Sequence, residues 1–150
     1  MRTILSELKQ VCIGLLFLLT AATAACGPSR EEPAPVLVGD VFTVGMGETA
    51  VIASENLTIT FESVLDDSRC PTNVECFWTG EARGVLSIQQ GDGEPVDWEF
   101  NTNPAPPLNI QSLEWGDYLL ELQSLDPYPQ DPEPAITQSE YRVTLVVTKP

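Results

Sequence analysis

The chain has 150 residues, of which 22 are Asp or Glu, 7 are Lys or Arg and none is His, and its net charge is −15 at pH 7. This charge repels nucleic-acid phosphates and anionic lipid head groups, so we expect no nucleic-acid partner. Without histidine, Ser–His–Asp and Cys–His catalytic arrangements cannot form, and the chain has no P-loop or dinucleotide fingerprint. We therefore expect a protein that is not an enzyme and needs no cofactor.

Residues 1–25 have the features of an export signal. Arg2 and Lys9 precede an apolar run of about 10 residues, which suits a signal peptide and is too short for a stable membrane span. We expect this segment, including Cys12, to be removed. Its removal takes away two cations and one anion, which changes the net charge from −15 to −16.

Cys26 follows Thr23-Ala24-Ala25 and precedes Gly27, a pattern that resembles a bacterial lipobox, in which the cysteine becomes the lipidated first residue. Thr23 stands where a lipobox usually has leucine. The alternative is ordinary cleavage after Ala24, which leaves an unpaired thiol in an oxidising compartment. We expect lipidation of Cys26, because several acyl chains, at about 0.8 kcal/mol per buried CH₂, hold a protein on a bacterial membrane, on its periplasmic or cell-surface side.

The segment 26–36 comprises the expected lipidated cysteine and a tether. Residues 28–35 mix prolines and charges with no apolar period, which is typical of an extended, solvated segment. Residues 37–150 form the single predicted domain, which is near the common domain size and can bury a core without a metal.

Short runs in this domain alternate apolar and polar residues, which is the period of a half-buried β-strand. The clearest runs are residues 57–61, 98–100, 118–122 and 141–147, and weaker ones are residues 41–44, 49–53, 84–90 and 107–110. The run at 118–122 also fits a short helix, and the glycines at 90–94 predict a hairpin turn. Seven or eight strands predict an all-β fold, an antiparallel β-sandwich with the general architecture of immunoglobulin domains. The alternative is a small β-barrel.

Two proline-rich segments, residues 103–107 and 126–134, cannot donate regular ladder hydrogen bonds. The second is acidic and contains Tyr128. It is either a solvated crossover between sheets or a semi-rigid polyproline segment that a partner grips through Tyr128. The acidic residues here and at 66–67 lack the spacing of an EF-hand loop, so we expect no metal site.

Cys70 and Cys76 lie six positions apart around a turn that Pro71 begins. A reversed chain brings two cysteine Cα atoms within the roughly 4.4–6.8 Å that a disulfide needs. The alternatives are two free buried thiols or half of a zinc site, but zinc sites usually pair closer cysteines with further Cys or His ligands. For an exported chain we predict a disulfide, which by chain entropy stabilises by about 2–3 kcal/mol and mainly fixes the shape of the loop.

The stretch from Asp67 to Ala82 reads D-S-R-C-P-x-x-V-x-C-x-W-x-G-x-A. This pattern resembles the signature of a family of small bacterial lipoproteins and secreted proteins with no established activity. The resemblance covers a small part of the chain. It implies export and a β-rich fold and supplies no catalytic residues.

Arg69 is a basic residue in an acidic segment, and it has two interpretations. Its guanidinium can pair with Asp67, Glu75 or Glu81 and hold the loop, which we favour. Alternatively, Arg69 and Trp78 form a binding patch, because Arg and Trp are common anchors at protein interfaces. For Trp78 we favour a position in the core against the disulfide.

Three functions are open at this point. The favoured one is a membrane-anchored, non-catalytic module that binds a partner in the bacterial envelope. The second is a protease inhibitor that presents Arg69 on the rigid loop to a trypsin-like pocket, since rigidity lowers the entropic cost of binding. The third is a small hydrolase with two carboxylates, for which no pair of acids stands out.

Overall fold

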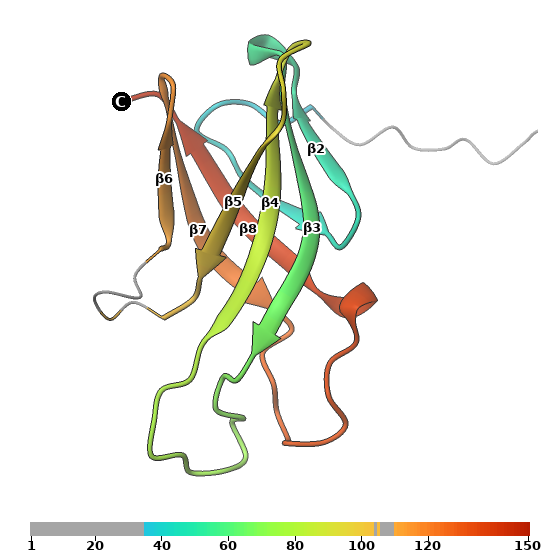
Figure 1. Ribbon diagram of the computed structural model, residues 1–150, viewed down its shortest axis with the longest axis vertical. Coiled ribbons are helices and arrows are strands. Elements are labelled where there is room, and N and C mark those ends of the chain that lie inside the picture. The colour runs from blue at the N-terminus through green and yellow to red at the C-terminus, as the bar shows by residue number, and fades with distance from the viewer. Residues whose placement is uncertain (1–34, 104, 106–109) are drawn as a thin grey trace, which may run out of the picture. The chain divides into compact units, whose positions relative to one another are not determined.

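The alternating runs form strands, and most strands turn their apolar residues to one side. The computed structural model describes residues 35–103, 105 and 110–150, so the predicted signal, Cys26 and nearly all of the tether lie outside the described residues. Figure 1 shows the arrangement of the strands. The elements in chain order are β1 (Val41–Gly45), β2 (Thr49–Ile52), η1 (Ala53–Glu55), β3 (Leu57–Asp67), β4 (Ala82–Gln90), β5 (Val96–Asn101), β6 (Ser112–Trp115), β7 (Tyr118–Asp126), η2 (Gln138–Glu140) and β8 (Arg142–Thr148).

The strands form two antiparallel sheets with the orders β1-β8-β7-β6 and β2-β3-β4-β5. The predicted β-sandwich is therefore confirmed, and the barrel alternative is wrong, because the two sheets are not closed into one by ladder pairing in the described part of the chain. The path of the chain differs from that of immunoglobulin domains. Within each sheet, most strands that lie next to each other are also consecutive in the chain. In immunoglobulin domains, Greek-key connections instead carry the chain from one sheet to the other.

The core lies between the sheets and consists of the residues that alternate inward. Its largest fully buried side chains are Ile52, Leu57, Ile59, Phe61, Leu86, Ile88, Phe100, Leu120, Val143, Leu145 and Val147. The rings of Phe61 and Phe100 lie 6.2 Å apart between centroids. A Cβ on Gly84 would lie 2.5 Å from Cζ of Phe100, so the ring of Phe100 can pack against the backbone of β4 only because this residue is glycine.

The strand predicted at 118–122 is confirmed as part of β7, and the alternative of a short helix there is wrong. The structure corrects the strand prediction at one place. No strand covers Ile110, and the rest of the predicted run 107–110 lies outside the described residues; β6 begins at Ser112 and turns into β7 through Gly116, which has a φ of 60°. The hairpin turn at 90–94 is confirmed, since the amide of Gly93 donates to the carbonyl of Gln90 at 3.0 Å.

Two long loops lie at one end of the sandwich, at the bottom of Figure 1. Residues 68–81 connect β3 to β4 and are called the clip loop here; residues 127–137 follow β7 and lead to η2 and β8, and are called the proline loop. Because β7 and β8 pair in one sheet, the second proline-rich segment is not a crossover between sheets, and that interpretation is wrong. Among the described residues, no helix is long and apolar enough to span a membrane.

Candidate functional site

The clip loop is closed by the predicted disulfide. Cys70 and Cys76 are bonded, with their Cα atoms 6.0 Å apart. At the neck of the loop, the amide of Ser68 donates to the carbonyl of Glu81 at 2.7 Å. Gly80 has a φ of 67°, and a Cβ there would lie 2.2 Å from the carbonyl oxygen of Ser68, so this close approach requires glycine. The loop is therefore fixed both across its middle and at its base.

Arg69 joins the base of the clip loop to the end of β7. Its Nε and Nη2 donate to the two carboxylate oxygens of Asp67 at 2.8 and 2.7 Å. Nη1 donates to the carbonyl of Leu125 at 2.6 Å, and Nη2 also donates to the carbonyl of Pro127 at 2.9 Å. The guanidinium carbon lies 5.0 Å from the centre of the Tyr128 ring, which adds a cation–π contact. The side chain is thus held on several sides.

Arg69 is only 7% exposed. Its pairing with Asp67 agrees with the favoured interpretation of this residue. The alternative, in which its guanidinium forms part of an exposed surface patch, is wrong, because the side chain is buried and donates to Asp67, Leu125 and Pro127 inside the protein. Because Arg69 is buried, its side chain is not accessible to the specificity pocket of a protease.

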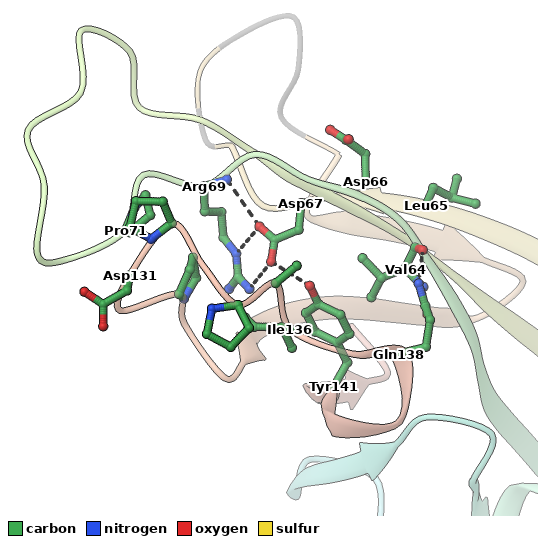
Figure 2. Close-up of a pocket in the computed structure, with 14 residues that line it drawn as sticks. Val64, Leu65, Asp66, Asp67, Arg69, Pro71, Asp131, Ile136, Gln138 and Tyr141 are labelled. Atoms are coloured by element: carbon green, nitrogen blue, oxygen red, sulfur yellow. Dashed lines mark hydrogen bonds and ion pairs between the residues drawn. The ribbon is translucent and has the colours of Figure 1, made fainter.

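Asp67 is the acceptor at the centre of this network (Figure 2). Besides the Arg69 side chain, it accepts bonds from the Arg69 amide at 3.2 Å and from the Tyr141 hydroxyl at 2.9 Å. Burial alone raises the pKa of the Asp67 carboxyl, but the hydrogen bonds and charge of Arg69, with the bond from Tyr141, bring this pKa below its ordinary value. Burial, followed by the bond to Asp67, raises the pKa of Tyr141 to about 12.

The proline loop pairs with the clip loop through backbone and side-chain bonds. The amides of Thr72 and Asn73 donate to the carbonyls of Pro129 and Gln130 at 3.1 and 3.0 Å. The Thr72 hydroxyl also donates to Oε1 of Gln130 at 2.8 Å, and the Asn73 side chain donates to Asp131 at 2.9 Å. Nothing in the sequence indicated this pairing, because neither segment has the alternation of a strand.

Gln138 ties the end of the proline loop to β3. Its Oε1 accepts from the Val64 amide at 3.1 Å and its Nε2 donates to the Val64 carbonyl at 2.7 Å. The register of β3 on β4 shifts between Val64 and Asp66, and the side chain of Gln138 there pairs with backbone groups of the bulged strand. Sequence reasoning missed this residue, since a single glutamine carries no positional signal.

Arg69 lines two cavities. The first, of about 380 Å³, lies between the end of β3 and the proline loop, and Figure 2 shows residues that line it, including Asp66, Asp131 and Tyr141. The second, of about 340 Å³, is lined by polar residues that include Asn103 and by Tyr128. Tyr128 is 42% exposed, with its ring against Arg69.

The tip of the clip loop exposes large apolar side chains. Phe77 is fully exposed, Trp78 is 65% exposed and Val74 is exposed as well. The prediction that Trp78 belongs to the core is therefore wrong. The disulfide closes a loop that projects beyond the strands, so the residues after Cys76 lie outside the sandwich, and Trp98 on β5 is buried instead.

The acidic residues at this end of the sandwich are mostly exposed. Of the acidic residues near the cavities, Asp67 is the most enclosed, and it is paired with Arg69; no two carboxylates of the described residues are buried together. Within the same residues, no group of three or more His, Cys, Asp or Glu is placed to hold a metal ion. Comparison of the chain with protein-family models, with curated proteins and with solved structures gives no match.

We predict that Arg69→Met lowers the free energy of unfolding by about 3–5 kcal/mol, because the carboxylate of Asp67 loses its charged partner and the buried carbonyl of Leu125 loses its donor. The matched control is Arg83→Met. Arg83 also pairs with a carboxylate, Glu99, but the two side chains are 42% and 50% exposed, so its loss should cost less than about 1 kcal/mol. Urea denaturation of both variants measures the difference. Equal losses would contradict the role assigned to Arg69.

We predict a second effect of this network at alkaline pH. Because the pKa of Tyr141 is raised to about 12 from an ordinary 10.0, the folded state holds this proton more tightly than the unfolded state. The resulting stability is complete below about pH 10 and is lost as the pH rises towards 12. The stability advantage of wild type over Tyr141→Phe should therefore be constant from pH 7 to 9 and shrink above pH 10. An advantage that stays constant throughout would show that the hydroxyl is not held in this way.

Proposed function

We propose that this chain is a lipid-anchored bacterial envelope protein whose β-sandwich binds a partner protein through the clip loop and catalyses no reaction. The observation that supports it best is the exposure of the consecutive residues Phe77 and Trp78 on a loop that a disulfide closes. Large aromatic side chains are costly to leave in water, and Trp is a frequent anchor at protein interfaces. An aromatic pair at the tip of a constrained loop is the arrangement expected of a recognition surface.

The constraints on the loop support the same proposal. The Cys70–Cys76 bond, the Arg69 network and the pairing with the proline loop each restrict a different part of the loop. Ordering a flexible side chain on binding costs about 0.5–1.5 kcal/mol, so a loop that is ordered beforehand keeps more of its contact energy as affinity.

The lipid anchor is proposed from the sequence alone. Cys26 would carry the acyl chains, and the residues between it and the domain would span roughly 30 Å at most if extended. A tether of this length keeps the domain close to the membrane surface, which suits a partner in the envelope.

The other two functions have less support. An inhibitor of a trypsin-like protease needs an accessible basic residue, and Arg69, the residue that it would present, is enclosed and paired with Asp67. A carboxylate hydrolase needs two acids with different proton affinities in one cleft. The first cavity contains Asp67, whose lowered pKa makes it a poor proton donor.

A photo-crosslinking experiment tests the binding surface. A benzoylphenylalanine introduced at Phe77 should give discrete crosslinked products in the native envelope, because this side chain would lie in the interface. The control is the same residue at Val96, an exposed apolar position on β5. A Phe77→Ser/Trp78→Ser variant should keep the unfolding midpoint of wild type and lose the partner. If position 77 gives no more products than position 96, the proposal fails.

Replacement of Cys26 tests the anchor. Cys26→Ser should move the protein from the membrane fraction to the soluble fraction, and mass spectrometry of the wild-type protein should find an acylated N-terminal cysteine. An unmodified Cys26, or a mature chain that begins before it, would contradict lipidation and leave the binding proposal to be judged by crosslinking.

A further inference from the structure

The end of the sandwich that carries the clip loop and the proline loop, called the loop end here, is strongly acidic. Residues 66–81 and 126–137, all of which the structure describes, contain seven acidic residues and one basic residue, a net charge of −6. The basic residue is Arg69, which is enclosed and neutralised by Asp67. Of the remaining acids, the exposed ones are Asp66, Glu75, Asp126, Asp131 and Glu133. The two loops and the strand ends that carry them therefore present carboxylates without a compensating cation, on the same end of the sandwich as Phe77 and Trp78, which are called the aromatic tip here.

The first cavity places some of these acids beside apolar walls. Asp66 and Asp131 line it together with prolines of both loops, Pro71 and Pro129 among them. Figure 2 shows the cavity between the end of β3 and the proline loop. A charged group next to apolar walls attracts an opposite charge more strongly than the same group in open water, because the local dielectric constant is lower. The aliphatic stem and charged head of a lysine or arginine match such a cavity.

We infer that the partner of the clip loop is a cationic protein surface, with an apolar cleft that takes Phe77 and Trp78 and a rim of lysine or arginine that faces the acids of the two loops. Basic side chains of the partner would pair with Asp66 and Asp131, which lie at opposite edges of the first cavity (Figure 2). This inference rests on the proposed binding function and adds the chemical class of the partner. Complementary charge speeds the encounter and excludes acidic surfaces.

A membrane surface fits these residues less well. Exposed aromatic side chains also enter the interface of a bilayer, but anionic lipid head groups would be repelled by the same carboxylates. The nearest acid, Glu75, lies within the clip loop itself, two positions before Phe77. Insertion of the tip would bring this charge to the head groups, whereas a cationic protein would pair with it.

Selection from a random dodecapeptide library on phage tests the inference. The target is the mature chain with Cys26→Ser, and Phe77→Ser/Trp78→Ser in the same background is the counter-target. Clones enriched on the first target alone should carry apolar residues and a net positive charge. A synthetic peptide from the leading clone should bind Asp66→Asn/Asp131→Asn roughly threefold to tenfold more weakly, as expected for two partly exposed ion pairs.

The matched control is Asp97→Asn/Asp117→Asn, which removes the same charge from exposed positions on β5 and on the turn between β6 and β7. This variant should retain the wild-type Kd. Raising the salt concentration from about 0.05 M to about 0.5 M should weaken binding of the wild type more than binding of Asp66→Asn/Asp131→Asn, because screening acts on the charges that the variant lacks.

Three results would overturn the inference, and they differ from one another. Enriched peptides that need Phe77 and Trp78 but are neutral or acidic would refute the cationic partner and leave the binding function standing. The absence of any enrichment over the counter-target would refute the binding function itself. Sedimentation with phosphatidylcholine vesicles that depends on Phe77 and Trp78, without peptide enrichment, would show that the aromatic tip binds lipid instead.

Discussion

The loop end of this protein depends on the guanidinium of Arg69. Arginine is the one side chain that presents donors in a planar fork, and here the fork meets the carboxylate of Asp67 on one side and two carbonyls at the end of β7 on the other. Asp67 ends β3 in one sheet and Leu125 lies in β7 of the other sheet. A single side chain therefore joins the two sheets where both long loops begin. A lysine, with a compact ammonium group, could not reproduce this geometry.

Polar side chains also tie the sheets together at the opposite end. The hydroxyl of Tyr118 at the start of β7 donates to Glu55 of η1 at 2.7 Å and accepts a bond from Gln90 at the end of β4. Lys149 pairs with the same Glu55 after β8 ends. Between these two polar ties the buried side chains are almost all apolar, so hydrophobic burial holds the sheets face to face and the polar contacts fix their ends.

The clip loop and the proline loop form one surface although 45 residues of the chain lie between the end of the first loop and the start of the second. A disulfide alone would shape only the short ring between Cys70 and Cys76. The backbone bonds from Thr72 and Asn73 to the proline loop extend this order to a segment that prolines prevent from forming a ladder of its own. The loops hold each other at Thr72 and Asn73, and the disulfide fixes Cys76 directly before the exposed Phe77 and Trp78, which is the restraint that the proposed binding function uses.

The sequence by itself predicted most of the strands, the disulfide and the pairing of Arg69 with a nearby acid, whereas the structure decided that this acid is Asp67 and not Glu75 or Glu81. These features are local: alternation acts over neighbouring residues, the two cysteines are six positions apart, and Asp67 lies two positions before Arg69. Only the tertiary structure decided that Trp78 is exposed and Trp98 buried, that Gln138 pairs with the bulge of β3, and that the proline loop packs on the clip loop. Each of these depends on contacts between residues far apart in the chain, and such contacts arise only when the two sheets pack and bring their loops to the same end.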